Sequence, residues 1–172
     1  MTTDDCEAVT LLRARGWRAA YTGLVPSSCL DAMERDVAED AQRRRAALAR
    51  GGPPVNLVAE RPGTGVIGWA CCGPLREPAG PPARGGLHAL YVTPEQTGTG
   101  AGRALMAEVL ARAAAQGLVE LELWVLRENV RARRFHERAG FGPDGAEESF
   151  EADGVRVPEV RYVRAPGGPG GR

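Results

Sequence analysis

The chain of 172 residues contains no lysine, only two histidines and a formal net charge of zero. Its 22 arginines balance 22 acidic residues, which argues against bulk electrostatic binding to nucleic acid or to an anionic membrane surface. The four cysteines form no C-x-x-C pair, and only His88 and His136 could join them, so we expect no metal site. The sequence shows neither a signal peptide nor an apolar run that could cross a bilayer. These absences predict a protein of the reducing cytoplasm with buried thiols.

The length suits one domain, which we place at residues 1–164, followed by a Pro/Gly tail at 165–172 that is expected to be disordered. Apolar residues at helical spacing and alternating apolar residues mark the elements between these limits. The predicted helices cover residues 8–21, 30–49, 103–116 and 129–139, and the predicted strands cover 55–60, 66–72, 87–92, 119–126, 142–151 and 155–163.

This order predicts an α/β fold with a mixed, mostly antiparallel central sheet and flanking helices. Helix 103–116 is the expected crossover between two parallel strands, and Asp153–Gly154 is the expected turn of the last hairpin. Residues 73–86 are rich in Pro and Gly and have no period, so they are expected to form a loop. That loop is either a substrate lid or a tolerated insertion.

The stretch from Leu87 to Ala114 contains a strand, a glycine-spaced loop T-G-T-G-A-G-R and a long helix. Glycines let the backbone approach a ligand closely, and the free N–H groups and dipole of a helix start attract anions. A P-loop is excluded because it needs a lysine. A dinucleotide fingerprint fails because Arg103 stands where its third glycine is required.

The remaining pattern, G-x-G-x-G-R at Gly98–Arg103, resembles the pyrophosphate loop of the GCN5-related N-acetyltransferase (GNAT) superfamily. Three further segments are similar to that family, so the resemblance runs from Ala8 to Val163. They are the W-x-x-A-Y-x-G-L-x-P segment from Trp17 to Pro26, the Y-V-x-P-E segment from Tyr91 to Glu95, and the Asn129–Phe141 segment with Ala132, Phe135 and Gly140.

The resemblance implies that the chain binds acetyl-CoA as co-substrate and transfers its acetyl group to an amine. It implies that the backbone of Leu90 and Val92 pairs with pantetheine and that the Val92 N–H polarises the thioester carbonyl. Asn129 is expected to hydrogen-bond pantetheine, to cap the helix that follows it, or to do both. The pyrophosphate is expected on the glycine loop, formed by Thr97, Gly98, Thr99, Gly100, Ala101, Gly102 and Arg103.

The sequence departs from the family pattern at four places. Thr97 replaces the Arg or Gln that often precedes the loop, with Gln96 one position earlier. His136 replaces the tyrosine that often protonates the leaving thiolate, so it is either that acid in protonated form or a packed core residue. Gly85–Gly86 replace the usual early glutamate of the central strand, where His88 and Tyr91 could act as the base. Alternation places His88 on the face of Leu90 and Val92 and Tyr91 on the other, so His88 is the preferred candidate. A base acting through ordered water, or an amine that binds in its neutral form, would need neither residue. The family's first strand is expected to be short or missing.

The acceptor is predicted to be a small-molecule amine or a peptide, with no nucleic acid or membrane partner and with a homodimer as a further expectation from the family. Glu120 and Glu122 suggest a cationic amine. A non-catalytic acyl-CoA-binding regulatory module of the same fold is the alternative function.

Overall fold

The computed structural model describes residues 1–75 and 83–165. The chain opens on three helices, continues through strands on both sides of a crossover helix, and ends on a hairpin. The elements are α1 (Cys6–Tyr21), α2 (Ser27–Arg35), α3 (Val37–Ala49), β1 (Val55–Arg61), β2 (Gly65–Pro74), β3 (Arg84–Val92), the 3-10 turn η1 (Pro94–Gln96), α4 (Ala101–Ala115), β4 (Glu120–Leu126), α5 (Val130–Arg138), β5 (Gly142–Ala152) and β6 (Val155–Arg164).

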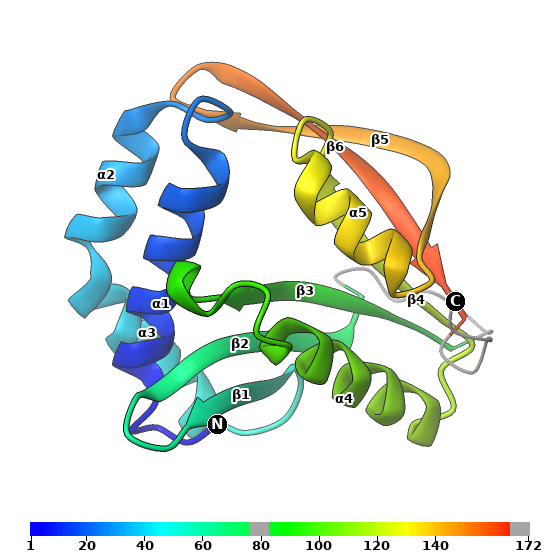
Figure 1. Ribbon diagram of the computed structural model, residues 1–172, viewed down its shortest axis with the longest axis horizontal. Coiled ribbons are helices and arrows are strands. Elements are labelled where there is room, and N and C mark those ends of the chain that lie inside the picture. Colours follow the sequence, from blue (N-terminus) through cyan, green and yellow to red (C-terminus); the bar gives the residue numbers. More distant parts are fainter. Residues whose placement is uncertain (76–82, 166–172) are drawn as a thin grey trace.

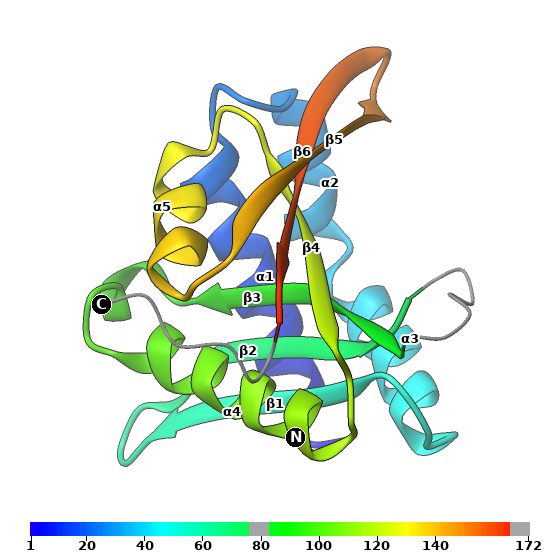
Figure 2. The ribbon, with the colours of Figure 1, turned by 90° about the vertical axis from the view of Figure 1, so that its right-hand side faces the viewer.

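Six strands form one sheet in the order β1-β2-β3-β4-β6-β5. Neighbouring strands are antiparallel except β3 and β4, which are parallel and are joined through α4, as predicted. Helix α4 covers one face of the sheet, whereas α1 packs on the opposite face against β2 and β3 (Figures 1 and 2). The predicted mixed, mostly antiparallel α/β fold is confirmed.

Strand β4 shows how the alternating sequence builds the main core. Leu121, Leu123 and Val125 are buried in the cluster beneath α4, together with Leu105 and Val109 of that helix. The alternate residues Glu120, Glu122 and Trp124 are only half-buried. Period-2 burial therefore fixes which face of β4 meets the helix.

Strands β3 and β4 stay paired only at their first residues. Their register joins Arg84, Gly85 and Gly86 to Glu120, Leu121 and Glu122, and no later pair follows among the described residues. From there β4 and β6 turn away from β3, so the sheet opens in its middle (Figure 2). The far side of this opening is closed by α1, α2 and the β5–β6 hairpin. These elements pack together around a hydrophobic cluster that contains Leu30, Leu126 and Val157. Trp17 and Tyr21 of α1 pack against this cluster.

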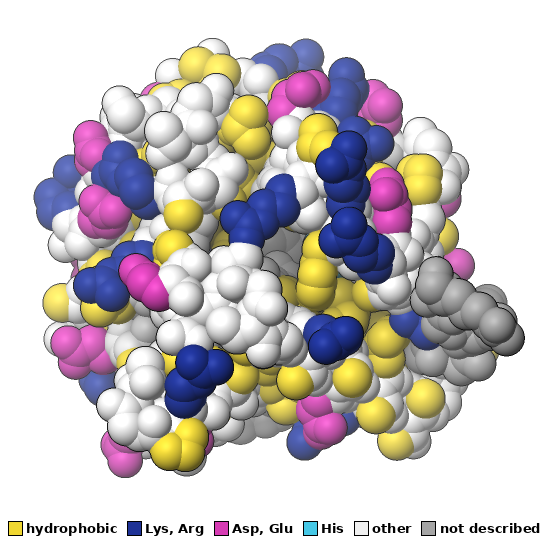
Figure 3. All heavy atoms as spheres, in the orientation of Figure 1, with side chains coloured by type: hydrophobic (Ala, Val, Ile, Leu, Met, Phe, Trp, Pro, Cys, Tyr) yellow, Lys and Arg dark blue, Asp and Glu magenta, His cyan; other side chains and the backbone are white. Residues whose placement is uncertain are grey.

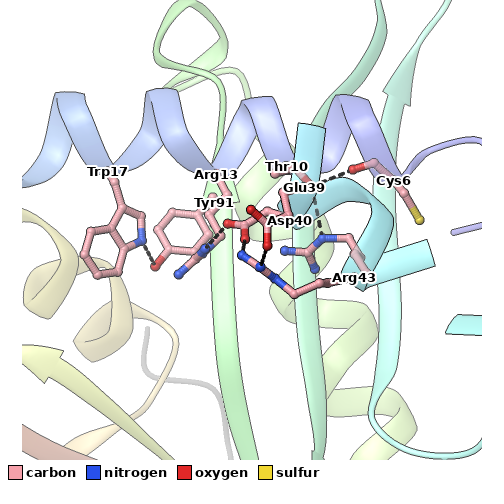
Figure 4. A network of polar contacts seen from close by, with 9 residues as sticks. Cys6, Thr10, Arg13, Trp17, Glu39, Asp40, Arg43 and Tyr91 are labelled. Carbon is pink, nitrogen blue, oxygen red and sulfur yellow. Dashed lines mark hydrogen bonds and ion pairs between the residues drawn. The ribbon is translucent and has the colours of Figure 1, made fainter. Parts of the chain in front are cut away.

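Helix α1 lies close on β3 because Gly16 presents no side chain there. A Cβ atom at Gly16 would lie 3.2 Å from Tyr91 Cδ1. The next residue, Trp17, donates from Nε1 to Tyr91 Oη at 2.8 Å. Figure 4 shows this bond in line with Thr10, whose hydroxyl donates to Cys6 O at 2.7 Å, and with the ion pairs of Arg43 on α3.

Two predicted boundaries are wrong. The helix predicted over residues 30–49 is broken at Asp36, because Leu30 packs toward the β5–β6 hairpin, whereas α3 packs against α1. Strands β2 and β3 extend further than predicted, so the loop is shorter than 73–86, and most of it, with the proposed lid, lies outside the described residues.

The structure near the two ends of the chain tests the predictions of a missing first strand and of a final hairpin. No strand precedes α1 in the described part of the chain, which opens with a short turn. The last hairpin is confirmed, since Asp153 and Gly154 have φ values of 48° and 77°, as a two-residue hairpin turn requires. Residues 166–172 lie outside the described part. No helix among the described residues is both long and apolar enough to cross a membrane.

Gly85 offers a test of the short β3–β4 junction. A Cβ atom there would lie 2.6 Å from Leu118 Cδ1, 3.2 Å from Gly73 O and 3.3 Å from Leu121 Cδ2. We expect Gly85→Ala to lower the free energy of unfolding by about 1–3 kcal/mol, because backbone and packed core must shift. Urea denaturation measures this loss.

Gly142→Ala is the matched control, since a Cβ atom at Gly142 meets nothing within 4 Å and its φ is not positive. We expect its stability to stay within about 0.5 kcal/mol of the parent. Equal stability of both variants would contradict the close packing described at Gly85.

Candidate active site

The opening between β3 and β4 is lined on one side by backbone groups of β3. The Thr93 N–H donates to Ile67 O of β2 at 2.9 Å. Alternate residues of a strand point their N–H and C=O groups to opposite sides, so those of Leu90 and Val92 point away from β2, toward the opening. A strand-like ligand lying between β3 and β4 would find these groups without a partner in the sheet.

The glycine loop turns the chain from β3 into α4. Gly98 and Gly100 have φ values of 82° and 97°, a region that L-residues rarely adopt. Gly102 differs, because it lies inside the helix, and a Cβ atom there would make ordinary contacts of 3.5 Å with Phe135 and Val92. Two of the three glycines are therefore required by the turn, while the third keeps side-chain bulk out of the first helical turn.

The start of α4 presents free donors. Its N-cap is Gly100, which offers no side-chain acceptor, and the first backbone bond into the helix comes from the Ala104 N–H to Gly100 O at 3.0 Å. Within the described residues nothing accepts from the N–H groups of Ala101, Gly102 and Arg103. Their direction and the helix dipole make this end of α4 suited to an anion, and Arg103 is exposed beside it.

Asn129 is the N-cap of α5. Its side-chain oxygen accepts from the Ala132 N–H at 3.1 Å, and its own backbone N–H donates to Leu126 O at 2.9 Å. The two N–H bonds of the side-chain amide have no partner among the described residues. The cap is therefore present, and the amide remains available as a donor at the end of β4.

His136 is packed between two aromatic rings. Its ring lies edge-on to Phe135 and Phe141, with centroids 5.3 Å and 6.0 Å away, and its Nδ1 atom is buried without a partner in the described structure. Burial lowers the pKa of His136 to about 4. The protonated ring required of a strong proton donor is thus scarce at neutral pH.

His88 is not on the face predicted for it. Cys71 is opposite Ala89 and Cys72 is opposite Leu87, so His88 is the extra residue of a β-bulge. The bulge interrupts the alternation: Leu87 and Leu90 share one core cluster, while Ala89 belongs to the cluster on the other face. The exposed His88 ring turns back toward Gly86, with Cε1 2.8 Å from the place of a Gly86 Cβ atom, at the point where β3 and β4 separate.

The acidic face of β4 is already occupied by arginines. Arg84 Nε donates to Glu120 Oε1 at 2.6 Å, and Arg84 and Arg161 each lie 3.5 Å from Glu122 Oε2. Glu120 and Glu122 therefore provide no surplus negative charge for a cationic amine.

Sequence reasoning named Tyr91 as a possible base but missed its hydrogen-bonding partners. The Tyr91 hydroxyl accepts from Trp17 Nε1 and shares a hydrogen bond with Tyr21. Burial raises the pKa of both tyrosines, and the charge of Glu159 on β6 raises it further. Both phenols are therefore neutral and can donate. The W-x-x-A-Y segment was a sequence signal for Trp17 and Tyr21, but no local pattern marks Glu159, which reaches them from another strand.

Comparison with known proteins identifies the family to which this site belongs. The profile described as "Acetyltransferase (GNAT) family" matches residues 17–141, well over half of the chain. The chain belongs to the GNAT acetyltransferase family. The matched range contains the opening in the sheet, the glycine loop and Asn129, as well as Trp17 and Tyr21.

Other GNAT proteins resemble it along nearly the whole length. An uncharacterised N-acetyltransferase of Bacillus subtilis (strain 168), YuaI, is 28% identical over 159 residues, which cover 91% of this chain and 86% of that protein. The PaiA N-acetyltransferase from Thermoplasma acidophilum, solved with coenzyme A, has a TM-score of 0.73 at 18% identity over 96% of this chain and 95% of that one. YncA from Salmonella typhimurium, solved with acetyl-CoA, has a TM-score of 0.70 at 21% identity over 100% and 94%. These two structures share the fold.

The low pKa of His136 predicts a pH-dependent stability. Its ordinary value is 6.5 and the folded value about 4, so the unfolded chain binds the proton more strongly. The stability from neutral His136 is complete above pH 6.5 and is lost as the pH falls toward 4, by up to roughly 3 kcal/mol. We expect His136→Phe to lose less stability over this range than the parent, as measured by urea denaturation at a series of pH values.

The carboxylates are common to both proteins and contribute equally to both slopes, so the difference between the two slopes belongs to His136. A His136→Phe slope equal to that of the parent would show that His136 titrates normally in the folded state.

Substitutions of Asn129 can separate its role as a helix N-cap from the proposed role of its side-chain amide as a hydrogen-bond donor to the cofactor. Asn129→Ser keeps a capping oxygen but removes the amide donors, whereas Asn129→Ala removes both. We expect Ala alone to lower the free energy of unfolding, by about 1 kcal/mol, and both variants to raise the KM for acetyl-CoA. A parental KM in Asn129→Ser would limit Asn129 to the cap.

Proposed function

We propose that the chain is an acetyl-CoA-dependent N-acetyltransferase in which an amine attacks the thioester directly. One observation carries the proposal: the unpaired edge of β3 leads straight into a loop and a helix start whose N–H groups are free. A ligand with amides followed by a pyrophosphate matches this row of backbone groups in chemistry and in order. Acetyl-CoA has that composition.

In this proposal each group of the site has one task. The backbone of Leu90 and Val92 pairs with the pantetheine amides, and the Val92 N–H polarises the thioester carbonyl. The loop from Thr97 to Gly102 and the charge of Arg103 hold the pyrophosphate. The Asn129 amide donates to pantetheine while its oxygen keeps the helix cap. No three His, Cys, Asp or Glu side chains among the described residues gather to hold a metal ion.

The transfer itself forms one bond and breaks one. The amine nitrogen bonds to the carbonyl carbon, the carbon–sulfur bond breaks, and the nitrogen loses a proton while the thiolate leaves. Because His136 is neutral at pH 7, it stabilises the thiolate by a hydrogen bond from its neutral ring rather than as an imidazolium. His88, at the point where the strands separate, remains the proposed base.

The proposed acceptor is a small amine or a peptide. We further propose that the enzyme is cytoplasmic and has no nucleic acid or membrane partner. A homodimer is the proposed assembly, by resemblance to the family. The competing proposal is a regulatory module that binds acyl-CoA without turnover, and the missing glutamate of β3 favours it. Incubation with acetyl-CoA and a panel of amines and peptides distinguishes the two. We expect release of free thiol and an acetylated amine, whereas tight binding with no release from any acceptor would favour the module.

Arg103 gives a direct test of the cofactor site. We expect Arg103→Gln to raise the KM for acetyl-CoA about tenfold with little change in kcat, because it removes a charge-assisted phosphate contact. Arg112→Gln, which is exposed on the last turn of the same helix, is the control and should leave KM unchanged. Equal effects of both substitutions would move the pyrophosphate away from the start of α4.

A further inference from the structure

The end of β3 carries a cluster of aromatic side chains on the face of the sheet that α1 covers. Trp17 Nε1 donates to Tyr91 Oη at 2.8 Å, and Figure 4 shows these two groups pointing toward each other. Tyr21 shares a hydrogen bond with Tyr91, and its ring meets that of Trp17 edge-on, with centroids 4.8 Å apart. Tyr91 also stacks on Trp69 of β2, with centroids 6.2 Å apart. The two phenol oxygens are therefore held in place beside the opening of the sheet.

Glu159 of β6 reaches this aromatic cluster from the other side of the opening. It lies directly opposite Leu126 of β4, and residues paired in this way have their side chains on one face of the sheet. Val157, two residues earlier in β6, lies on that face as well. Leu126 and Val157 belong to the hydrophobic cluster against which Trp17 and Tyr21 pack. The carboxylate of Glu159 therefore lies on the face that carries the aromatic side chains.

Two arginines lie near the aromatic cluster, and each contacts another acid. Arg13 Nη1 of α1 lies 3.9 Å from Asp40 Oδ2 of α3. Arg161, two residues after Glu159 in β6, binds Asp144 at 2.7 Å. Both positive charges thus have acidic partners in other elements.

The charge of Glu159 prevails over that of Arg13 at Tyr21. Burial is the main cause of the raised pKa of Tyr21, and the charge of Glu159 raises this pKa by more than Arg13 lowers it. At Tyr91 the order of the two charges is reversed. The negative charge is therefore concentrated at the end of the cluster formed by Tyr21 and Glu159.

The aromatic cluster lies where an acceptor would approach the thioester. Tyr91 precedes Val92, whose N–H is the proposed donor to the thioester carbonyl, and its side chain packs on the α1 face of the sheet. The glycine loop leads into α4, which covers the opposite face. Figure 3 shows a hollow between α1 and α5, at the place of the opening in Figure 1. An amine that enters from the α1 side therefore passes Tyr21 and Glu159 before it meets the cofactor.

We propose that the acceptor is a primary alkylamine that arrives as its ammonium ion and that Glu159 selects it, an inference that rests on the proposed function. An ammonium group has three N–H donors, and the carboxylate of Glu159 and the oxygen of Tyr21 can accept from two of them. The faces of the Trp17 and Tyr21 rings attract a cation as well. An arylamine is neutral at the same pH and gains nothing from the carboxylate. Glu159 therefore distinguishes alkylamines from arylamines.

The test measures thiol release from acetyl-CoA at neutral pH with a panel of primary alkylamines, among them benzylamine, and of arylamines, among them aniline. The parent is expected to have the higher kcat/KM with alkylamines. Glu159→Gln should raise the KM for alkylamines about 10- to 100-fold, as the loss of a charge-assisted hydrogen bond implies, while kcat and the KM for acetyl-CoA stay near the parental values. Glu159→Asp keeps the charge and should raise the KM less. Circular dichroism checks that each variant is folded.

Glu151→Gln is the matched control, because it removes an exposed carboxylate of the same hairpin and should leave the KM for alkylamines unchanged. The inference is overturned if the parent acetylates arylamines as efficiently as alkylamines, or if Glu159→Gln leaves the KM for alkylamines at the parental value. It is also overturned if Glu159→Gln raises the KM for acetyl-CoA equally, which would assign Glu159 a structural role. If the parent releases no thiol with any acceptor, the proposed function fails and this inference with it.

Discussion

The separation of β3 from β4 after three residue pairs is the constraint on which the rest of the structure depends. A sheet leaves few backbone groups without partners, and a gap in its middle exposes a row of them on Leu90 and Val92. The chain then turns at Gly98 and Gly100 and begins α4 with three further free donors. The opening and the helix start are consecutive in the sequence, so one ligand can satisfy both.

Local chemistry explains how much could be predicted. Gly98, Gly100 and the Asp153–Gly154 turn need positive φ, and this requirement is visible in the residue type. Asparagine is a favoured N-cap residue, so the position of Asn129 before a helix predicts its cap. The alternation of apolar and polar residues in β4 predicts which side chains are buried. The crossover through α4 can be predicted because a strand, a loop and a helix of ordinary length follow one another in the sequence. The fold, the turns of the glycine loop and the Asn129 cap could therefore be predicted from the sequence.

The features that sequence reasoning missed depend on distant parts of the chain. The bulge at His88 exists because β2 supplies one residue fewer than β3, which no pattern within β3 reveals. The low pKa of His136 requires Phe141 as well as Phe135, and the neutralisation of Glu122 requires Arg84 and Arg161 from two other strands. The break at Asp36 lets α2 pack on both α1 and the β5–β6 hairpin, whereas α3 packs on α1. Each of these features depends on contacts between segments that are far apart in the sequence, and the local sequence alone does not indicate it.

The opening in the sheet also ties the lifetime of the protein to its ligand. A molecule that completes the edge of β3 binds only the folded state, and at 100 times its Kd such a ligand adds about 2.7 kcal/mol to stability. When the ligand is scarce, β3 and β4 are held by three pairs and by the clusters around them. Local opening and proteolysis should then begin at this seam. The abundance of the folded protein would then rise and fall with the supply of that ligand.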